Sequence, residues 1–176
     1  MASKGPPPGT MPDIGSPYVL EYRGRFTFAA SPGEMWEALE HTERFEGWWS
    51  WLGQFRLEGS RLEEGAVLHG VVAPPVPYRM RVRVVVGRCA APRRLEATVH
   101  GDLEGVARLE VRPEGAGSEA EVWWAVEMTQ VPMRIAARVA RPLLCWGHDR
   151  VVEATVAGFR RHLAGGGGAA GKLGPG

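Results

Sequence analysis

The feature that most constrains this chain is one long segment with helical periodicity near its C-terminus, from Met133 to Leu163. At about 100° per residue, its buried stripe consists of Leu144, His148, Val151, Thr155 and Phe159. The charged residues of the segment fall off this stripe. The pattern predicts an amphipathic helix with one polar side chain in its buried face. Pro142 predicts a kink or a new helix start in the first turns.

Most of the sequence before this helix has the alternating pattern of β-strands. Between residues 18 and 28, for example, aromatic and aliphatic side chains alternate with Glu, Arg and Thr. A mostly antiparallel sheet has an apolar face that must be covered, and only one long helix is available to cover it. The predicted strands are residues 18–28, 54–58, 66–73, 78–86, 94–100, 103–112 and 119–129.

Two short helical segments are predicted after the first strand. Ser31, Pro32 and Glu34 form a capping box with proline at the first helical position, which predicts a helix start. A second short segment, residues 42–51, carries a dense aromatic group: Trp48, Trp49 and Trp51. We expect two of these three indoles in the core, with a pocket lip or a partner surface as the alternatives.

The length of 176 residues suits one domain with tails. Residues 1–16 and 164–176 are rich in Pro and Gly and are predicted to be disordered tails, which leaves residues 17–163 as the folded domain. There is no signal-peptide pattern, and the two cysteines form no metal or disulfide spacing. We therefore expect a cytoplasmic protein without stable membrane insertion.

The composition argues against several classes of site. A net charge of +1 and the lack of aromatic residues among the basic ones argue against nucleic-acid binding. Because the only lysines, Lys4 and Lys172, lie in the tails, the sequence predicts neither a Schiff base nor a phosphate clamp, and no cofactor. The row Arg79, Arg81 and Arg83 is predicted to form cross-strand ion pairs with Glu96, Glu110, Glu119 and Glu121.

Four segments resemble a known superfamily. They are Phe26–Trp36, Trp48-Trp49, Glu64-Gly65 and Trp146-Gly147-His148-Asp149. In these segments the chain resembles the START-like superfamily, also called SRPBCC, and within it the polyketide cyclase/dehydrase-type proteins. The resemblance covers residues 17–163. It implies an α+β helix-grip fold, in which a curved seven-stranded antiparallel sheet wraps around the C-terminal helix and encloses a cavity for a hydrophobic small molecule.

His148 is the sharpest candidate for chemistry, because an imidazole in such a cavity could bind a ligand carbonyl or act as an acid or base. The alternative is a core histidine with a hydrogen-bond partner. A metal site pairing it with His69, whose direction is ambiguous, would lack a third ligand, so we predict no metal. The predicted cavity wall is Phe28, Met80, Val82, Trp124, Met128, Leu144, His148 and Val151.

Three functions remain open from the sequence. The first is binding of a lipid, polyketide, isoprenoid or aromatic metabolite within apolar walls. The second is a cyclase or dehydratase that uses His148 as its acid or base. The third is a protein-interaction module that uses the Trp cluster or the outward-facing Trp123.

Overall fold

The computed structural model describes residues 10–166, and most of the two predicted tails lies outside this range. Within it the chain forms seven strands, four α-helices and one short 3-10 helix. The strands are β1 Val19–Phe28, β2 Leu52–Glu58, β3 Val67–Val72, β4 Met80–Ala90, β5 Arg94–Gly101, β6 Leu103–Glu114 and β7 Gly117–Met128. The helices are α1 Pro32–Glu40, η1 Thr42–Arg44, α2 Phe45–Trp48, α3 Val131–Val139 and α4 Arg141–Gly166.

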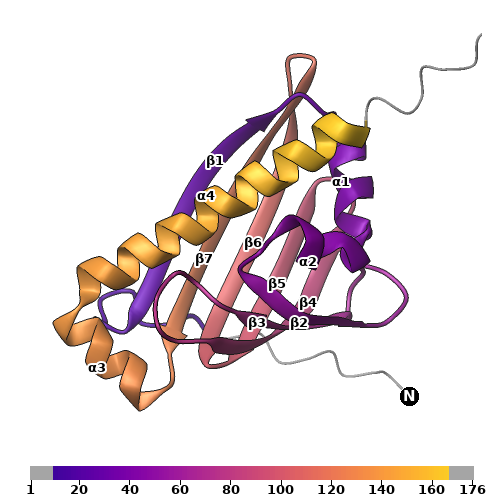
Figure 1. Cartoon of the computed structure of the whole chain (residues 1–176). Helices are drawn as coiled ribbons and strands as arrows, with labels where there is room; N and C mark the ends of the chain where they lie inside the picture. Colours follow the sequence, from indigo (N-terminus) through magenta and orange to yellow (C-terminus); the bar gives the residue numbers. More distant parts are fainter. Residues whose placement is uncertain (1–9, 167–176) are drawn as a thin grey trace, which may run out of the picture.

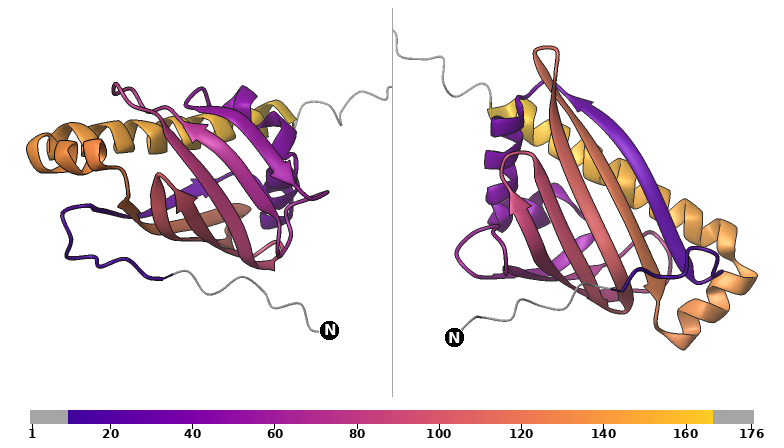
Figure 2. Two further views of the ribbon diagram at one scale, coloured as in Figure 1. Left: turned by 90° about the horizontal axis from the view of Figure 1, so that it is seen from below. Right: turned by 180° about the vertical axis from the view of Figure 1, so that it is seen from behind.

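The strands form one antiparallel sheet in the order β1-β7-β6-β5-β4-β3-β2. Helix α4 crosses one face of this sheet, with α1 and α2 at one end of the helix and α3 at the other (Figure 1). Seen from below and from behind, the helices of residues 10–166 lie on one side of the sheet and do not cover its other face (Figure 2). The predicted α+β architecture, a seven-stranded antiparallel sheet with a long C-terminal helix, is confirmed.

The helix boundaries follow from local chemistry. At the start of α1, the Ser31 N–H donates to the Glu34 carboxylate at 2.7 Å, and the Glu34 N–H donates to the Ser31 hydroxyl at 3.4 Å, as the capping box predicted. The predicted C-terminal helix restarts rather than kinks, because Ala140 separates α3 from α4. Helix α4 runs to Gly166, three residues past the predicted domain boundary at Leu163.

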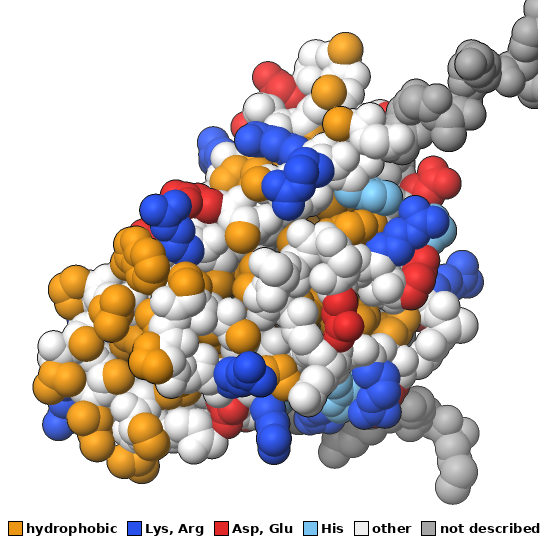
Figure 3. All heavy atoms as spheres, in the orientation of Figure 1, with side chains coloured by type: hydrophobic (Ala, Val, Ile, Leu, Met, Phe, Trp, Pro, Cys, Tyr) orange, Lys and Arg blue, Asp and Glu red, His pale blue; other side chains and the backbone are white. Residues whose placement is uncertain are grey.

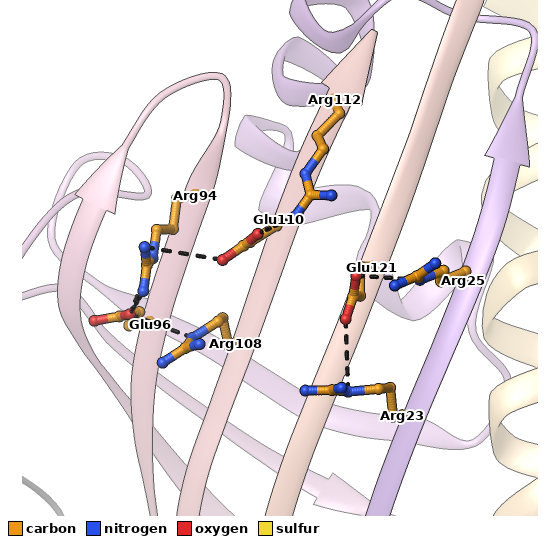
Figure 4. Close-up of polar contacts among 8 residues, drawn as sticks. All are labelled: Arg23, Arg25, Arg94, Glu96, Arg108, Glu110, Arg112 and Glu121. Atoms are coloured by element: carbon orange, nitrogen blue, oxygen red, sulfur yellow. Dashed lines mark hydrogen bonds and ion pairs between the residues drawn. The ribbon is translucent and has the colours of Figure 1, made fainter. Parts of the chain in front are cut away.

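The strand register sorts the side chains between the two faces. Val86, Ala97, Ala107, Trp124 and Tyr22 face one another across five strands, and their row points toward α4. The opposite face of the sheet carries charged side chains (Figure 4). There Glu96 pairs with Arg94 and Arg108, Glu110 with Arg94 and Arg112, and Glu121 with Arg23 and Arg25.

The predicted ion pairs of the arginine row are wrong. Among residues 10–166, none of Arg79, Arg81 and Arg83 has a carboxylate within ion-pair distance. The register explains this result, since Arg83 lies between His69 and His100, and Arg81 lies opposite Val71. The glutamates are opposite other arginines.

Two of the clusters of buried side chains lie near the two ends of α4. Met35, Ala38, Val111, Ala120 and Phe159 pack together near α1. The second cluster, near α3, contains Met80, Met128, Met133, Ala137 and Leu144. Two separate clusters under one helix imply that the helix and the sheet do not meet along its whole length.

Candidate functional site

A cavity of about 410 Å³ lies between the sheet and α4, in the gap between these clusters. Its walls come from strands β1 and β3–β7, from α1, from the segment after α2, from the loop between β3 and β4, and from the inner face of α4. The α4 residues are Leu144, His148, Val151, Val152, Thr155, Val156 and Phe159. The helical stripe predicted from the sequence therefore faces the cavity. Almost all of the wall is hydrocarbon.

Of the eight predicted wall residues, seven surround this cavity: Phe28, Met80, Val82, Trp124, Leu144, His148 and Val151. Met128 is the exception, and the prediction that it lines the cavity is wrong. Its side chain is 1% exposed, and it packs with Met133 and Ala137 of α3 rather than facing the void. Met128 lies at the end of β7, where α3 covers the sheet directly.

The tryptophan cluster divides differently from the expectation of two core residues. Trp49 and Trp51 line the cavity, with their rings stacked at a centroid distance of 5.7 Å. Trp48 instead packs on Phe159 and stacks on His162 at 4.1 Å. All three rings are half-buried, so the cluster is mainly cavity wall and not an exposed patch.

The segment after α2 is held against α4 at one defined place. The Trp49 indole N–H donates to the carbonyl oxygen of Thr155 at 3.0 Å. One turn further along α4, a Cβ atom at Gly158 would overlap the carbonyl oxygen of Trp48. A glycine at this position therefore allows the Trp49 side of the cavity to close on the helix.

The sequence did not identify many of the apolar wall residues, although most were in the right register. Examples are Leu20 and Phe26 on β1 and Val122 and Val126 on β7. Alternation alone would have placed them on the covered face. What it could not supply was how far α4 stands off the sheet over each of them.

His148 is mostly buried, with 18% of its side chain exposed, and both ring nitrogens have partners. The Trp124 indole N–H donates to His148 Nε2 at 3.2 Å, and His148 Nδ1 lies 3.3 Å from the Asp149 carboxylate. Tyr22 stacks on Trp124 at 4.7 Å and lies 5.2 Å from the imidazole. Burial raises the pKa of the Tyr22 phenol, and the Asp149 carboxylate raises it further.

These partners define the state of the imidazole. Because an indole N–H can only donate, Nε2 of His148 must accept, so its proton is on Nδ1, toward Asp149. Protonation at Nε2 would place two N–H groups against each other. Use of Nε2 as a catalytic base would likewise require Trp124 to move away. In this arrangement His148 is a neutral polar group fixed within the cavity wall.

We expect the ¹⁵N NMR spectrum of the His148 ring to show the neutral Nδ1–H tautomer in the wild-type protein. Trp124→Phe removes the indole donor to Nε2, so the proton should shift toward Nε2, with a loss of about 1 kcal/mol of stability. Trp123→Phe is the matched control, since Trp123 donates to Glu21 on the opposite face at 3.1 Å. An Nε2–H tautomer in the wild-type protein would contradict the assignment.

The other histidines considered as candidates lie away from the cavity. His69 points to the opposite face of the sheet, 3.0 Å from the Glu58 carboxylate, so it forms no pair with His148. His100 bonds Glu104 and Thr98 on that same face. Over residues 10–166 there is no group of three metal-ligating side chains.

Two further polar groups belong to residues of the cavity wall. The indole N–H of Trp51 is buried and has no acceptor among residues 10–166. The Tyr78 phenol also borders the cavity, and burial raises its pKa.

Comparison with solved structures identifies the fold. TTHA0849 from Thermus thermophilus superposes with a TM-score of 0.67 at 16% identity, over 84% of this chain and 99% of that one. Ara h 8.0201 superposes with a TM-score of 0.59 at 11% identity, over 84% of this chain and 99% of that one. The chain has the START-like helix-grip fold. The di-domain ARO/CYC protein BexL, from the BE-7585A biosynthetic pathway, shares it with a TM-score of 0.63 at 13% identity, over 85% of this chain and 51% of BexL.

No family model matches the sequence. No curated protein matches it either. The likeness is therefore one of helix-grip architecture, and the chemistry has to be argued from this chain's own cavity. Among residues 10–166, no helix is both long and apolar enough to cross a membrane.

Proposed function

We propose that this helix-grip protein binds a hydrophobic small molecule in the cavity between its sheet and α4. The observation that carries the proposal is the void itself, about 410 Å³ with an almost wholly apolar wall. Small-molecule sites have volumes of roughly 300–1,000 Å³ and mostly apolar walls with a few polar groups. A solved relative in fold, BexL, is named as an ARO/CYC protein of a biosynthetic pathway, which fits a cavity that holds an organic molecule.

The volume suggests the size of the ligand. An engineered apolar cavity of about 150 Å³ stays dry and binds benzene. The cavity here, at about 410 Å³, has room for about two to three benzene-sized groups. A fused aromatic metabolite, an isoprenoid or a medium-length acyl chain has this size and polarity.

The polar groups indicate a ligand with few heteroatoms. A ligand oxygen within reach of the Trp51 N–H would give that buried donor an acceptor. The Tyr78 phenol is a second group that a ligand oxygen could contact. Of the residues that the structure describes, no Asp, Glu, Lys or Arg borders the cavity, so a strongly ionic ligand would lose its hydration without compensation.

The enzyme hypothesis, with His148 as acid or base, is less well supported. His148 Nε2 already accepts the Trp124 N–H, and Nδ1 faces Asp149, so neither nitrogen is free toward a substrate. We therefore place His148 in the wall as a ligand contact rather than as a catalytic group.

A cavity-filling variant tests the binding proposal. Ala107 lies in the middle of β6, opposite Trp124, and lines the void, so Ala107→Phe should place a phenyl ring inside it. We expect affinity for the neutral fluorophore N-phenyl-1-naphthylamine to fall at least tenfold, while the melting temperature stays equal or rises because the ring fills space. Fluorescence titration and thermal unfolding measure the two effects.

The control is Ala157→Phe, because Ala157 is exposed on α4 and does not line the cavity. It should bind the fluorophore like the wild type. If Ala107→Phe fails to fold, Val82→Phe fills the same void from β4. Unchanged affinity in a folded cavity-filled variant, or no binding by the wild type, would overturn the proposal.

A further inference from the structure

Helix α3 has apolar side chains on both faces. Met133 and Ala137 point inward and are 5% and 3% exposed. Val131, Ile135 and Val139, spaced four residues apart, point the opposite way and are 67%, 58% and 79% exposed. The outer face of an ordinary surface helix is polar, so an apolar outer face needs an explanation.

The start of α4 extends this surface. Leu143 is 48% exposed and Trp146 is 45% exposed. Within residues 10–166, five of the seven exposed large hydrophobic side chains belong to the stretch from Val131 to Trp146, which we call the elbow patch. The other two, Met11 and Ile14, precede β1. In the space-filling view, hydrophobic side chains crowd the end of the molecule where α3 lies (Figure 3).

The charged side chains of the segment that carries the elbow patch are all basic. Between Met128 and His148 there are three arginines, at positions 134, 138 and 141, and no Asp or Glu. Arg134 is paired with Glu127. Arg138 lies over the Tyr18 ring at 5.2 Å, and Arg141 donates to the carbonyl oxygen of Pro17 at 2.6 Å. Neither of these two has a carboxylate partner within residues 10–166, so both keep their charge available.

From this surface we infer a docking site for an anionic phospholipid bilayer, with α3 lying in the plane of the interface. Interfacial helices combine exposed aliphatic and Trp side chains with Arg or Lys. If a second copy of this chain packed its own elbow patch here, Arg138 and Arg141 would meet a segment that contains basic residues and no acidic ones. An anionic lipid surface supplies the missing charge. This inference concerns the outer surface and does not depend on what the cavity binds.

Vesicle co-sedimentation with the full chain tests the inference. We expect binding to vesicles of mixed phosphatidylglycerol and phosphatidylcholine, at least tenfold weaker binding to phosphatidylcholine alone, and loss of binding at raised salt. Arg138→Gln should weaken binding about fivefold, since one basic residue near an anionic surface contributes about 1 kcal/mol. The double variant Ile135→Glu/Val139→Glu should weaken it at least tenfold.

The controls introduce the same residue types, Glu and Gln, outside the elbow patch. Ala157→Glu and Arg161→Gln alter exposed positions toward the other end of α4 and should bind vesicles like the wild type. If the double variant does not fold, Val139→Glu alone changes the most exposed residue of the patch. Ala107→Phe should keep vesicle binding even when its cavity is filled, which separates this inference from the proposed function.

Three results would overturn the inference. The first is no binding of the wild type to either vesicle. The second is equal binding by wild type and elbow-patch variants. The third is a concentration-dependent dimer in light scattering that Ile135→Glu/Val139→Glu dissociates, which would make the patch a contact between copies.

Discussion

Met128→Ala should lower the free energy of unfolding by about 3–4 kcal/mol, within the range found when a buried methionine is truncated. The side chain is 1% exposed and packs with Met133, Ala137 and Leu144, which belong to two different helices. Truncation would open a new void where sheet, α3 and α4 meet, and neighbours fixed from three sides can collapse into it only in part. Urea unfolding at constant m-value measures the loss.

Met80→Ala is the matched comparison, because Met80 lies in the same cluster but also borders the cavity. A side chain with a void on one side has fewer packing contacts to lose, so we expect a smaller cost, about 2 kcal/mol. For ligand affinity, we expect the larger effect from Met80→Ala, the variant with the smaller loss of stability. Met80→Ala should change N-phenyl-1-naphthylamine affinity, and Met128→Ala should leave the affinity of the folded protein unchanged. Equal stability losses, or a larger affinity change for Met128→Ala, would contradict the assignment of Met128 to the core.

The contrast between these two methionines shows what the alternation of side chains can predict about the covered face of the sheet and what it cannot. Alternation along residues 78–86 and 119–129 placed both Met80 and Met128 on the covered face of the sheet, and both are there. Alternation carries no information on which helix covers each position. Met128 lies under α3, in direct contact, whereas Met80 lies where α4 begins to stand off the sheet.

On the charged face, the sequence predicted which side of the sheet the arginines occupy but not their ion-pair partners. Alternation correctly put Arg79, Arg81 and Arg83 on one face, but pairing depends on which residue each neighbouring strand places opposite. Arg83 lies opposite His69 and His100, and Arg81 lies opposite Val71, whereas the β4 residue opposite Glu96 is Arg88. Which residues lie opposite one another depends on how whole strands pair, so the local alternation of side chains could not supply it.

The hydrogen-bond partner of His148 Nε2 could not be predicted from the sequence either. The helical stripe indicated that His148 faces the sheet, but its partner Trp124 is 24 residues away and on another element. Only the crossing of α4 over β7 brings the two rings together. That contact determines which nitrogen of the imidazole carries the proton.

The place where the Trp49 segment meets α4 gives the second large expected effect. Gly158 is buried in the interior of α4, and glycine there costs about 1 kcal/mol of helix propensity relative to alanine. The compensating contact is the backbone of Trp48, whose carbonyl oxygen occupies the space of a Cβ. Trp49 Cδ1 also lies 3.1 Å from that position. Because the obstacle is backbone, it cannot rotate away.

Gly158→Ala should therefore reduce the free energy of unfolding by about 2 kcal/mol despite the better helix propensity, since overpacking a tight contact costs about 1–3 kcal/mol and the Trp49–Thr155 hydrogen bond contributes about 1 kcal/mol more. The control is Gly147→Ala in the same helix, where the nearest atom to a new Cβ is Val76 Cγ1 at 3.2 Å. That methyl belongs to a loop side chain and can move, so Gly147→Ala should be neutral or slightly stabilising. Urea unfolding of the two variants gives the comparison. A Gly158→Ala protein as stable as the wild type would show that α2 is free to move off α4, and that this side of the cavity is not fixed by the contact.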